Sequence, residues 1–426
     1  MNSGTTTGET GLGNSIKASE LMPQILILLI CLIAGCATPA TEKFDSLISQ
    51  QDPIAVGELT RAGRLFANLE ARGNLMSLGD ADDYMSAMLA KLYPEQHQDF
   101  KIHIARLPGE NAFALSTGVV VIHLSLLAAL ENEHQLAFVL AHEFEHINAR
   151  HGYLGAHIRR NTRVKAHLTD LLVMGSGLSY PYFASGLQEF NRAQELEADQ
   201  RAALVLLKAG FDVAEAARFF DVLVDYVNPT QLLVQSGTHP DNQVRKKELL
   251  TLAAMQDRSG SEYSSSGYQS IRPLLLRLSI EEKIEDLDFL SALVQAEALS
   301  AYPAERAQVH CFEGEIYHQM AVTHPELFAD IVLVKDMREH AGFDLPVVFT
   351  AASSRAYFLN RATSEFVALE KLQPDSSCSA RGLGVTFLAI GQHVQARDHL
   401  RRYLRLNPGA HDRRYILDLL STSAAI

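Results

Sequence analysis

The residues His142, Glu143 and His146 form an HExxH pattern inside an apolar stretch of the chain. Side chains four positions apart lie on one face of a helix, so the two imidazoles would converge on a single Zn²⁺ ion. Glu143 would then lie beside a water molecule at the metal, where a carboxylate can accept a proton and pass it to a leaving amine. The pattern therefore predicts zinc-dependent hydrolysis, with two histidine ligands and Glu143 as the catalytic base.

A catalytic zinc ion needs a third protein ligand and one open position. Glu195 and Asp199 lie four residues apart in the downstream segment ELEAD, so they would share one face of a helix. We expect Glu195 to bind the metal and Asp199 to receive the free ring N–H of a ligating histidine. Glu197 would point away by about 200°, as a structural or solvated carboxylate. A structural zinc ion is the weaker alternative, because such sites usually have four Cys or His ligands.

The elements that must position these residues follow from the periodicity of apolar side chains. Asn132, with Gln135 three residues later, is a suitable N-cap for the helix that carries the HExxH pattern. The sequence predicts a mainly α protein with a small β-sheet, an α+β fold. We expect helices in residues 41–90, 133–151, 188–209 and 212–227, and strands in residues 100–107 and 111–122.

A Ser- and Gly-rich segment, residues 259–270, is typical of a linker. It would separate a metallopeptidase domain, residues 36–258, from a helical domain, residues 271–426. Small and apolar residues in the last part of the chain have the spacing of a tetratricopeptide repeat, and a generic helical bundle is the alternative. The residues that fit the spacing are Leu383, Gly384, Phe387, Ala396, Leu400 and Pro408, with Gly314 and Tyr317 in a degraded earlier unit.

The N-terminal segment, residues 1–35, contains a short apolar run that is typical of a secretory signal. It ends in Ile-Ala-Gly-Cys, which resembles a bacterial lipobox, so we expect lipidation of Cys36; a plain cleaved signal or a short anchor is the alternative. The apolar segment 171–187 is broken by Gly and Pro, which favours a mobile lid over a buried loop. For Cys311 and Cys378 we expect two free, buried thiols, although an oxidising compartment would permit a disulfide.

The composition excludes some classes of function. The 426 residues include 47% hydrophobic and 20% charged side chains, an ordinary globular mixture that excludes wholesale disorder. The net charge of −13, without a basic block, argues against nucleic acid as a partner. A single apolar run, near the N-terminus, argues against a protein with many membrane spans.

Three segments together resemble the HtpX-like zinc metallopeptidases, the group that includes the CAAX prenyl proteases: NAFAL at 111–115, QLAFVLAHEFEHINARH at 135–151 and ELEAD at 195–199. The resemblance covers roughly residues 50–250. It implies a zincin-like domain with His142, His146 and Glu195 as ligands and Glu143 as the base.

The resemblance also implies that the strand 111–115 borders the cleft. Its residues Asn111, Ala112, Phe113 and Ala114 could hold an extended substrate by strand addition. A His-Pro segment lies close to the active site in relatives, so His239 could be a fourth, inhibitory zinc ligand or gate; a structural loop histidine is an equal alternative. We expect Arg245 to pair with an acidic neighbour.

These observations predict a zinc endopeptidase of the bacterial periplasm, lipid-anchored to the outer membrane, that degrades misfolded or stalled envelope proteins. Its helical repeats would bind clients or the outer-membrane assembly machinery. The alternative is a chaperone or assembly factor with a latent zinc site. The intact Glu143 favours the enzyme.

Overall fold

The computed structural model describes residues 52–161, 192–226, 242–254, 266–323 and 351–422. The expected signal with its lipidated Cys36, the segment 171–187 and His239 lie outside these residues. The chain forms two compact units, Met1–Thr60 and Arg61–Ile426. Helix α2 (Pro53–Ala71) crosses this boundary, so its residues from Arg61 onward belong to the second unit together with all the other elements. Among the described helices, none combines the length and the apolar character that crossing a membrane requires.

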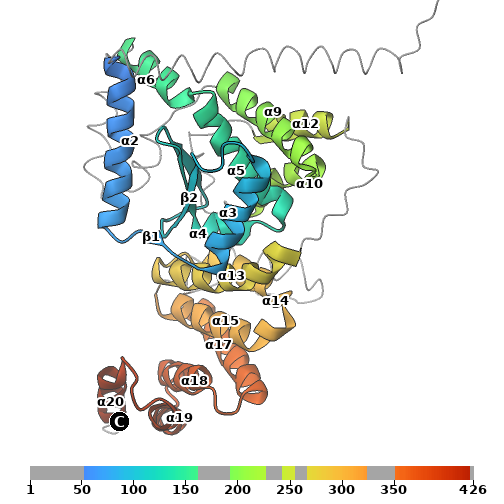
Figure 1. The fold of residues 1–426 in the computed structure, drawn as a ribbon. Coiled ribbons are helices and arrows are strands. Elements are labelled where there is room, and N and C mark those ends of the chain that lie inside the picture. Colours follow the sequence, from blue (N-terminus) through green and yellow to red (C-terminus); the bar gives the residue numbers. More distant parts are fainter. Residues whose placement is uncertain (1–51, 162–191, 227–241, 255–265, 324–350, 423–426) are drawn as a thin grey trace, which may run out of the picture. The chain divides into compact units, whose positions relative to one another are not determined.

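The second unit is mostly helical with one four-stranded sheet (Figure 1), as the sequence predicted. Its N-terminal part contains β1 (Leu75–Met76), α3 (Asp80–Leu92), β2 (Lys101–Ala105), β3 (Ala112–Leu115), β4 (Val119–His123), α4 (Leu124–Ala129), α5 (Glu133–Asn148), α6 (His151–Asn161), α9 (Arg192–Ala209), α10 (Val213–Ala217), α11 (Phe219–Tyr226) and α12 (Asn242–Ala253). Its C-terminal part contains α13 (Ser266–Glu285), α14 (Phe289–Ser300), a 3₁₀ turn (Pro303–Glu305), α15 (Arg306–Val322), α17 (Ala351–Leu372), α18 (Ser377–Ile390), α19 (His393–Leu406) and α20 (Arg413–Thr422).

The sheet has the strand order β1-β2-β4-β3, which leaves β3 at an edge. Strands β2 and β4 pair in parallel, whereas β3 pairs antiparallel with β4, with Ala112 opposite Ile122. Alternate side chains of a strand point to opposite faces of the sheet. Both faces are packed against helices. Val121 packs into a cluster with Leu65 of α2, and Ile122 packs into the larger core that contains α5.

Helix α5 begins where the sequence predicted, because the Asn132 side chain accepts hydrogen bonds from the backbone N–H groups of His134 and Gln135. Its end is earlier than predicted. The helix stops at Asn148, and Arg150 adopts a left-handed conformation with φ 59°. That conformation turns the chain, so His151 begins the separate helix α6.

The segment 212–227, for which we expected one helix, contains α10 and α11 instead. Asp212 caps α10 through its side chain, which accepts hydrogen bonds from the N–H groups of Ala214 and Glu215. Helix α10 ends at Ala217, Arg218 is its C-cap, and α11 begins at Phe219. Splitting the segment brings Phe219 and Phe220 against Phe138 of α5.

The helix α13 begins at Ser266, inside the segment for which we expected a linker. Residues 266–270 are therefore helical, and Tyr268 among them is fully buried. The Tyr268 hydroxyl donates to the backbone oxygen of Leu127, and Gln269 Nε2 donates to the backbone oxygen of Glu131 at 2.7 Å. One hydrophobic core contains residues from both sides of the expected linker.

The C-terminal helices pack closely where glycine leaves room for a neighbour. A Cβ atom on Gly384 would lie 2.5 Å from the Leu400 side chain, and one on Gly314 would lie 2.6 Å from the Phe366 ring. These contacts join α18 to α19 and α15 to α17. Larger side chains at these glycines would force the helices apart.

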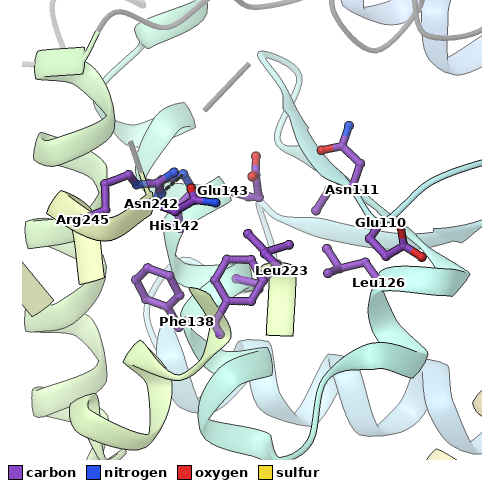
Figure 2. A pocket seen from close by; sticks show the side chains of 12 residues that line it. Glu110, Asn111, Leu126, Phe138, His142, Glu143, Leu223, Asn242 and Arg245 are labelled. Carbon is purple, nitrogen blue, oxygen red and sulfur yellow. Dashed lines mark hydrogen bonds between the residues drawn. The ribbon is translucent and has the colours of Figure 1, made fainter. Parts of the chain in front are cut away.

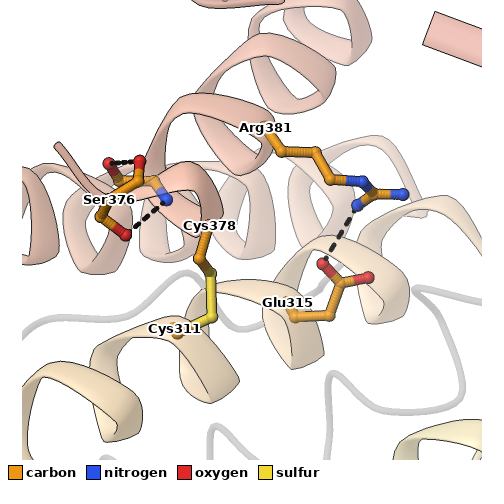
Figure 3. Close-up of a disulfide and its surroundings, with 6 residues drawn as sticks. Cys311, Glu315, Ser376, Cys378 and Arg381 are labelled. Atoms are coloured by element: carbon orange, nitrogen blue, oxygen red, sulfur yellow. Dashed lines mark hydrogen bonds and ion pairs between the residues drawn. A yellow bond between two sulfur atoms is a disulfide. The ribbon is translucent and has the colours of Figure 1, made fainter. Parts of the chain in front are cut away.

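A disulfide joins Cys311 of α15 to Cys378 of α18 (Figure 3), with 6.1 Å between the Cα atoms. The expectation of two free thiols was wrong. Sequence spacing does not reveal that two cysteines 67 residues apart meet. Their Cα separation is within the range that an unstrained disulfide requires.

Candidate metal centre and cleft

Helices α5 and α9 pack against each other and bring together His142, His146 and Glu195. The Nε2 atoms of the two histidines lie 3.0 Å apart. Those of His142 and His146 lie 3.6 and 3.5 Å, respectively, from the two carboxylate oxygens of Glu195. All three side chains are buried. The fold thus positions two imidazole nitrogens and a carboxylate around a common point.

These distances fit zinc. Ligand atoms about 2.05 Å from a tetrahedral Zn²⁺ ion lie roughly 3.3 Å from one another, close to the separations of the three donors. Two imidazoles and one carboxylate are also a donor set that catalytic zinc sites use, with a fourth position left open. His142, His146 and Glu195 could therefore hold a zinc ion without rearrangement of the two helices.

A carboxylate and a guanidinium surround the first histidine. Asp199 Oδ1 lies 3.0 Å from His142 Nδ1, and Arg245 donates to both Asp199 oxygens at 2.7 and 2.8 Å. Arg245 also lies 3.2 Å from Glu195 Oε2, so the expected pairing with an acidic neighbour is confirmed. Burial alone would raise the pKa of Asp199, but the hydrogen bonds from Arg245 and His142 outweigh it and lower that pKa.

The same surroundings favour positive charge on His142. Burial would lower its pKa, yet the hydrogen bonds to Asp199 and Glu195 raise it to about 9. A proton therefore binds here strongly in the absence of a metal. The negative charge that retains the proton would also attract a divalent cation.

The second histidine has a neighbour that the sequence did not predict. His146 Nδ1 lies 2.8 Å from Nδ1 of His151, because the turn at Arg150 brings α6 back toward α5. Glu197 Oε2 lies 3.5 Å from Nε2 of His151. This contact with His151 is the main reason that the pKa of Glu197 falls to about 2, and Arg201 contributes as well. Glu197 is 46% exposed and also pairs with Arg201 at 2.7 Å.

Glu143 is buried and lines a cavity beside His142. In Figure 2 its carboxylate points into the cavity, with His142 and Arg245 on one side and Asn111 on the other. The part of the wall nearest α5 is apolar and was not predicted from the sequence. It is formed by Leu126, Phe138, Val139, Phe219 and Leu223.

The predicted substrate strand borders this cavity at its N-terminal end. Asn111 and Ala112 line the cavity, whereas Ala114 is buried in the main core and Phe113 packs on the opposite face of the sheet. His123 N donates to Asn111 O at 2.9 Å, so residues 111 and 113 direct their backbone groups toward β4. The backbone groups of Ala112 and Ala114 point away from β4, toward the open edge of the sheet that the described strands form.

Comparison with known proteins places the cleft in a family context. Residues 82–253 match the model of peptidase family M48. The chain is 32% identical over 245 residues to the beta-barrel assembly-enhancing protease of Escherichia coli, covering 51% of this chain and 49% of that protein. It is 27% identical over 235 residues to the putative beta-barrel assembly-enhancing protease of Vibrio cholerae, covering 48% and 47%.

The chain is also similar, over a shorter region, to a mitochondrial protein. The chain is 29% identical over 153 residues to the mitochondrial metalloendopeptidase OMA1 of Schizosaccharomyces pombe, covering 35% of this chain and 45% of that protein. The chain thus spans about half the length, or less, of these curated relatives. The family model and the names of the relatives support a metalloendopeptidase.

Proposed function

We propose that the chain is a zinc-dependent endopeptidase that degrades misfolded or stalled proteins of the bacterial envelope. The observation that carries the proposal is the convergence of His142, His146 and Glu195 beside the buried carboxylate of Glu143. The match to peptidase family M48 includes all four residues. Zinc held by the first three would polarise a peptide carbonyl and make a water molecule more acidic. Glu143 would accept a proton from that water and return it to the leaving amine.

The form of the cleft supports an extended polypeptide as the substrate. The outward backbone groups of Ala112 and Ala114 could pair with such a chain by strand addition, which requires an unfolded backbone and little sequence specificity. The apolar wall with Leu126, Phe138 and Leu223 would accommodate an apolar side chain next to the scissile bond. Apolar side chains in an extended backbone are exposed in misfolded proteins and buried in folded ones.

The envelope location is supported by two observations. The disulfide between Cys311 and Cys378 requires an oxidising compartment, such as the periplasm. The lipobox-like sequence that ends at Cys36 is consistent with a lipid anchor in the outer membrane. The helical region from α13 onward would form tetratricopeptide-type repeats that bind clients or the assembly machinery, and His239 would act as a gate or a fourth ligand.

A second candidate function is assembly of outer-membrane proteins with the protease held latent. The names of the bacterial relatives, which describe enhancement of β-barrel assembly, favour it. In this case the helical region would hold clients while the zinc site stays closed. The two functions differ in whether turnover of an unfolded client accompanies its binding.

The test is metal analysis combined with cleavage of an unfolded β-barrel protein, comparing the wild type with Glu143→Gln. The substitution removes the proton acceptor and leaves all three ligands, so zinc should remain bound while cleavage falls about 10²–10⁴-fold. Glu145→Gln is the matched control on the same helix, because Glu145 bonds to Tyr93 and Asn148 rather than to the ligands. Cleavage by Glu143→Gln at the wild-type rate would refute the role of Glu143 as the base. Absence of zinc from the wild type would refute the proposed metal centre.

A further inference from the structure

Beyond the three ligands, a chain of polar groups leads from the metal centre to the surface. It consists of His146, His151, Glu197 and Arg201. His146 and His151 are fully enclosed, whereas Glu197 is 46% exposed. Successive contacts measure 2.8 Å between the two imidazoles, 3.5 Å from His151 to Glu197 and 2.7 Å from Glu197 to Arg201. These four polar residues belong to the helices α5, α6 and α9.

The contacts determine where each proton must lie when zinc is bound. Nε2 of His146 faces His142 and Glu195, so it must offer its lone pair to the metal and the ring proton must be on Nδ1. That N–H donates to His151 Nδ1, which must be an acceptor. His151 therefore carries its own proton on Nε2, which faces the carboxylate of Glu197. Each group in the chain can thus adopt one role compatible with its neighbours.

We propose that His151 and Glu197 are positioning residues that fix the tautomer and ring orientation of the zinc ligand His146. The inference rests on the proposed zinc site. The two histidine ligands would then be held in place by different hydrogen-bond partners. His142 bonds directly to the buried carboxylate of Asp199, whereas His146 reaches its carboxylate through a second imidazole. Such outer hydrogen bonds typically contribute 10–100-fold to metal affinity.

A purely structural role for His151 makes a different prediction. As a space-filling residue, a buried ring that touches His146 could be replaced by another ring of similar size without loss of zinc affinity. A positioning residue needs a hydrogen-bond acceptor at the place of Nδ1. Phenylalanine retains a ring but no acceptor, whereas the Asn side-chain oxygen can accept a hydrogen bond from His146 Nδ1.

The experiment measures the zinc dissociation constant of the full chain by competition with a chelator. His151→Phe should raise it about 10–100-fold, and His151→Asn should restore most of the wild-type affinity. Glu197→Leu should raise it as well, by a smaller factor, because His151 still accepts from His146. His318→Phe is the matched control, since it breaks a 3.1 Å contact with Thr386 Oγ1 in the helical region and should leave zinc affinity unchanged.

Thermal unfolding without metal identifies any variant that fails to fold, and His151→Asn then carries the test. Wild-type affinity in a folded His151→Phe variant would overturn the positioning role, as would equally weak binding by the Asn and Phe variants. If Glu197→Leu binds zinc with wild-type affinity, Glu197 does not help to position His146. These results are distinguishable from failure of the proposed function, in which the wild-type chain itself would not bind zinc.

Discussion

At the scale of single residues, the buried carboxylate of Asp199 has two partners, which are His142 and Arg245. It fixes the orientation of a zinc ligand and neutralises a buried guanidinium. Replacing it with Asn retains a hydrogen-bond acceptor but removes the negative charge. The two consequences should therefore appear in different measurements, namely metal affinity and stability.

We expect Asp199→Asn to raise the zinc dissociation constant about 10-fold, at the lower end of the effect of an outer ligand. The unfolding temperature should also fall, because the buried Arg245 would lose one of its two carboxylate partners and keep only Glu195. Asp221→Asn is the matched control, since Asp221 pairs with Lys246 in a more exposed contact between α11 and α12. Equal zinc affinities of the wild type and Asp199→Asn would contradict the prediction.

The candidate ligands could be predicted from the sequence, because HExxH and ELEAD have the helical spacing that the chemistry requires. The surroundings of His146 could not. A single left-handed residue, Arg150, decides that His151 turns back toward α5, and apolar periodicity carries no signal for that turn. The apolar wall of the cavity could not be predicted from the sequence either, since Phe219 reaches the site only because the predicted helix divides into α10 and α11.

At the scale of elements, the disulfide constrains α15 relative to α18 across 67 residues of sequence. We expect Cys378→Ser to lower the free energy of unfolding by about 2–4 kcal/mol, because the unfolded chain regains the entropy of an open loop. Reduction of the wild type should have the same effect and should not further destabilise the variant. Chemical denaturation with and without a reductant measures both. A reductant that destabilises the wild type and Cys378→Ser equally would contradict the role of the bond.

The helix α13 contains a carboxylate whose burial makes stability depend on pH. Glu282 is mostly buried, and one of its oxygens has no hydrogen-bond partner among the residues that the structure describes. Burial, followed by the charge of Asp286, raises its pKa to about 7, although Arg106 opposes the shift. Between its ordinary value of 4.5 and about 7, the folded protein binds a proton that the unfolded chain has lost. Stability therefore falls as pH rises through this window.

We expect Glu282→Gln to stabilise the protein more at pH 8 than at pH 4, because the amide carries no charge at either pH. Thermal unfolding of both proteins at the two pH values gives the difference directly. The exposed Glu248 provides the control Glu248→Gln, measured at the same two pH values. A Glu282→Gln effect of the same size at both pH values would show that burial does not perturb this carboxyl.

At the scale of the whole second unit, an ion pair connects the helical region to the cleft. Lys283 of α13 lies 2.6 Å from Glu110, and both side chains are 5% exposed. Glu110 lines the cavity next to Asn111, immediately before the edge strand β3. Gln295 of α14 also donates to the backbone oxygen of Ser125, at 3.4 Å. The helical region therefore supports the wall of the cleft, in agreement with the single core that both regions share.

We expect Lys283→Met to lower the free energy of unfolding by about 3–5 kcal/mol, because Glu110 would remain buried without its countercharge. Cleavage of an unfolded substrate should also slow, since the chain around Asn111 would shift at the mouth of the cavity. Lys246→Met breaks the ion pair with Asp221, which is more exposed than the pair of Lys283 and Glu110, so it should lower the free energy of unfolding far less. The double variant Lys283→Met/Glu110→Leu should recover much of the stability, because neither buried charge then lacks its partner. If the single variant unfolds at the wild-type temperature, or if the double variant is no more stable than the single one, the helical region does not hold the cleft through this pair.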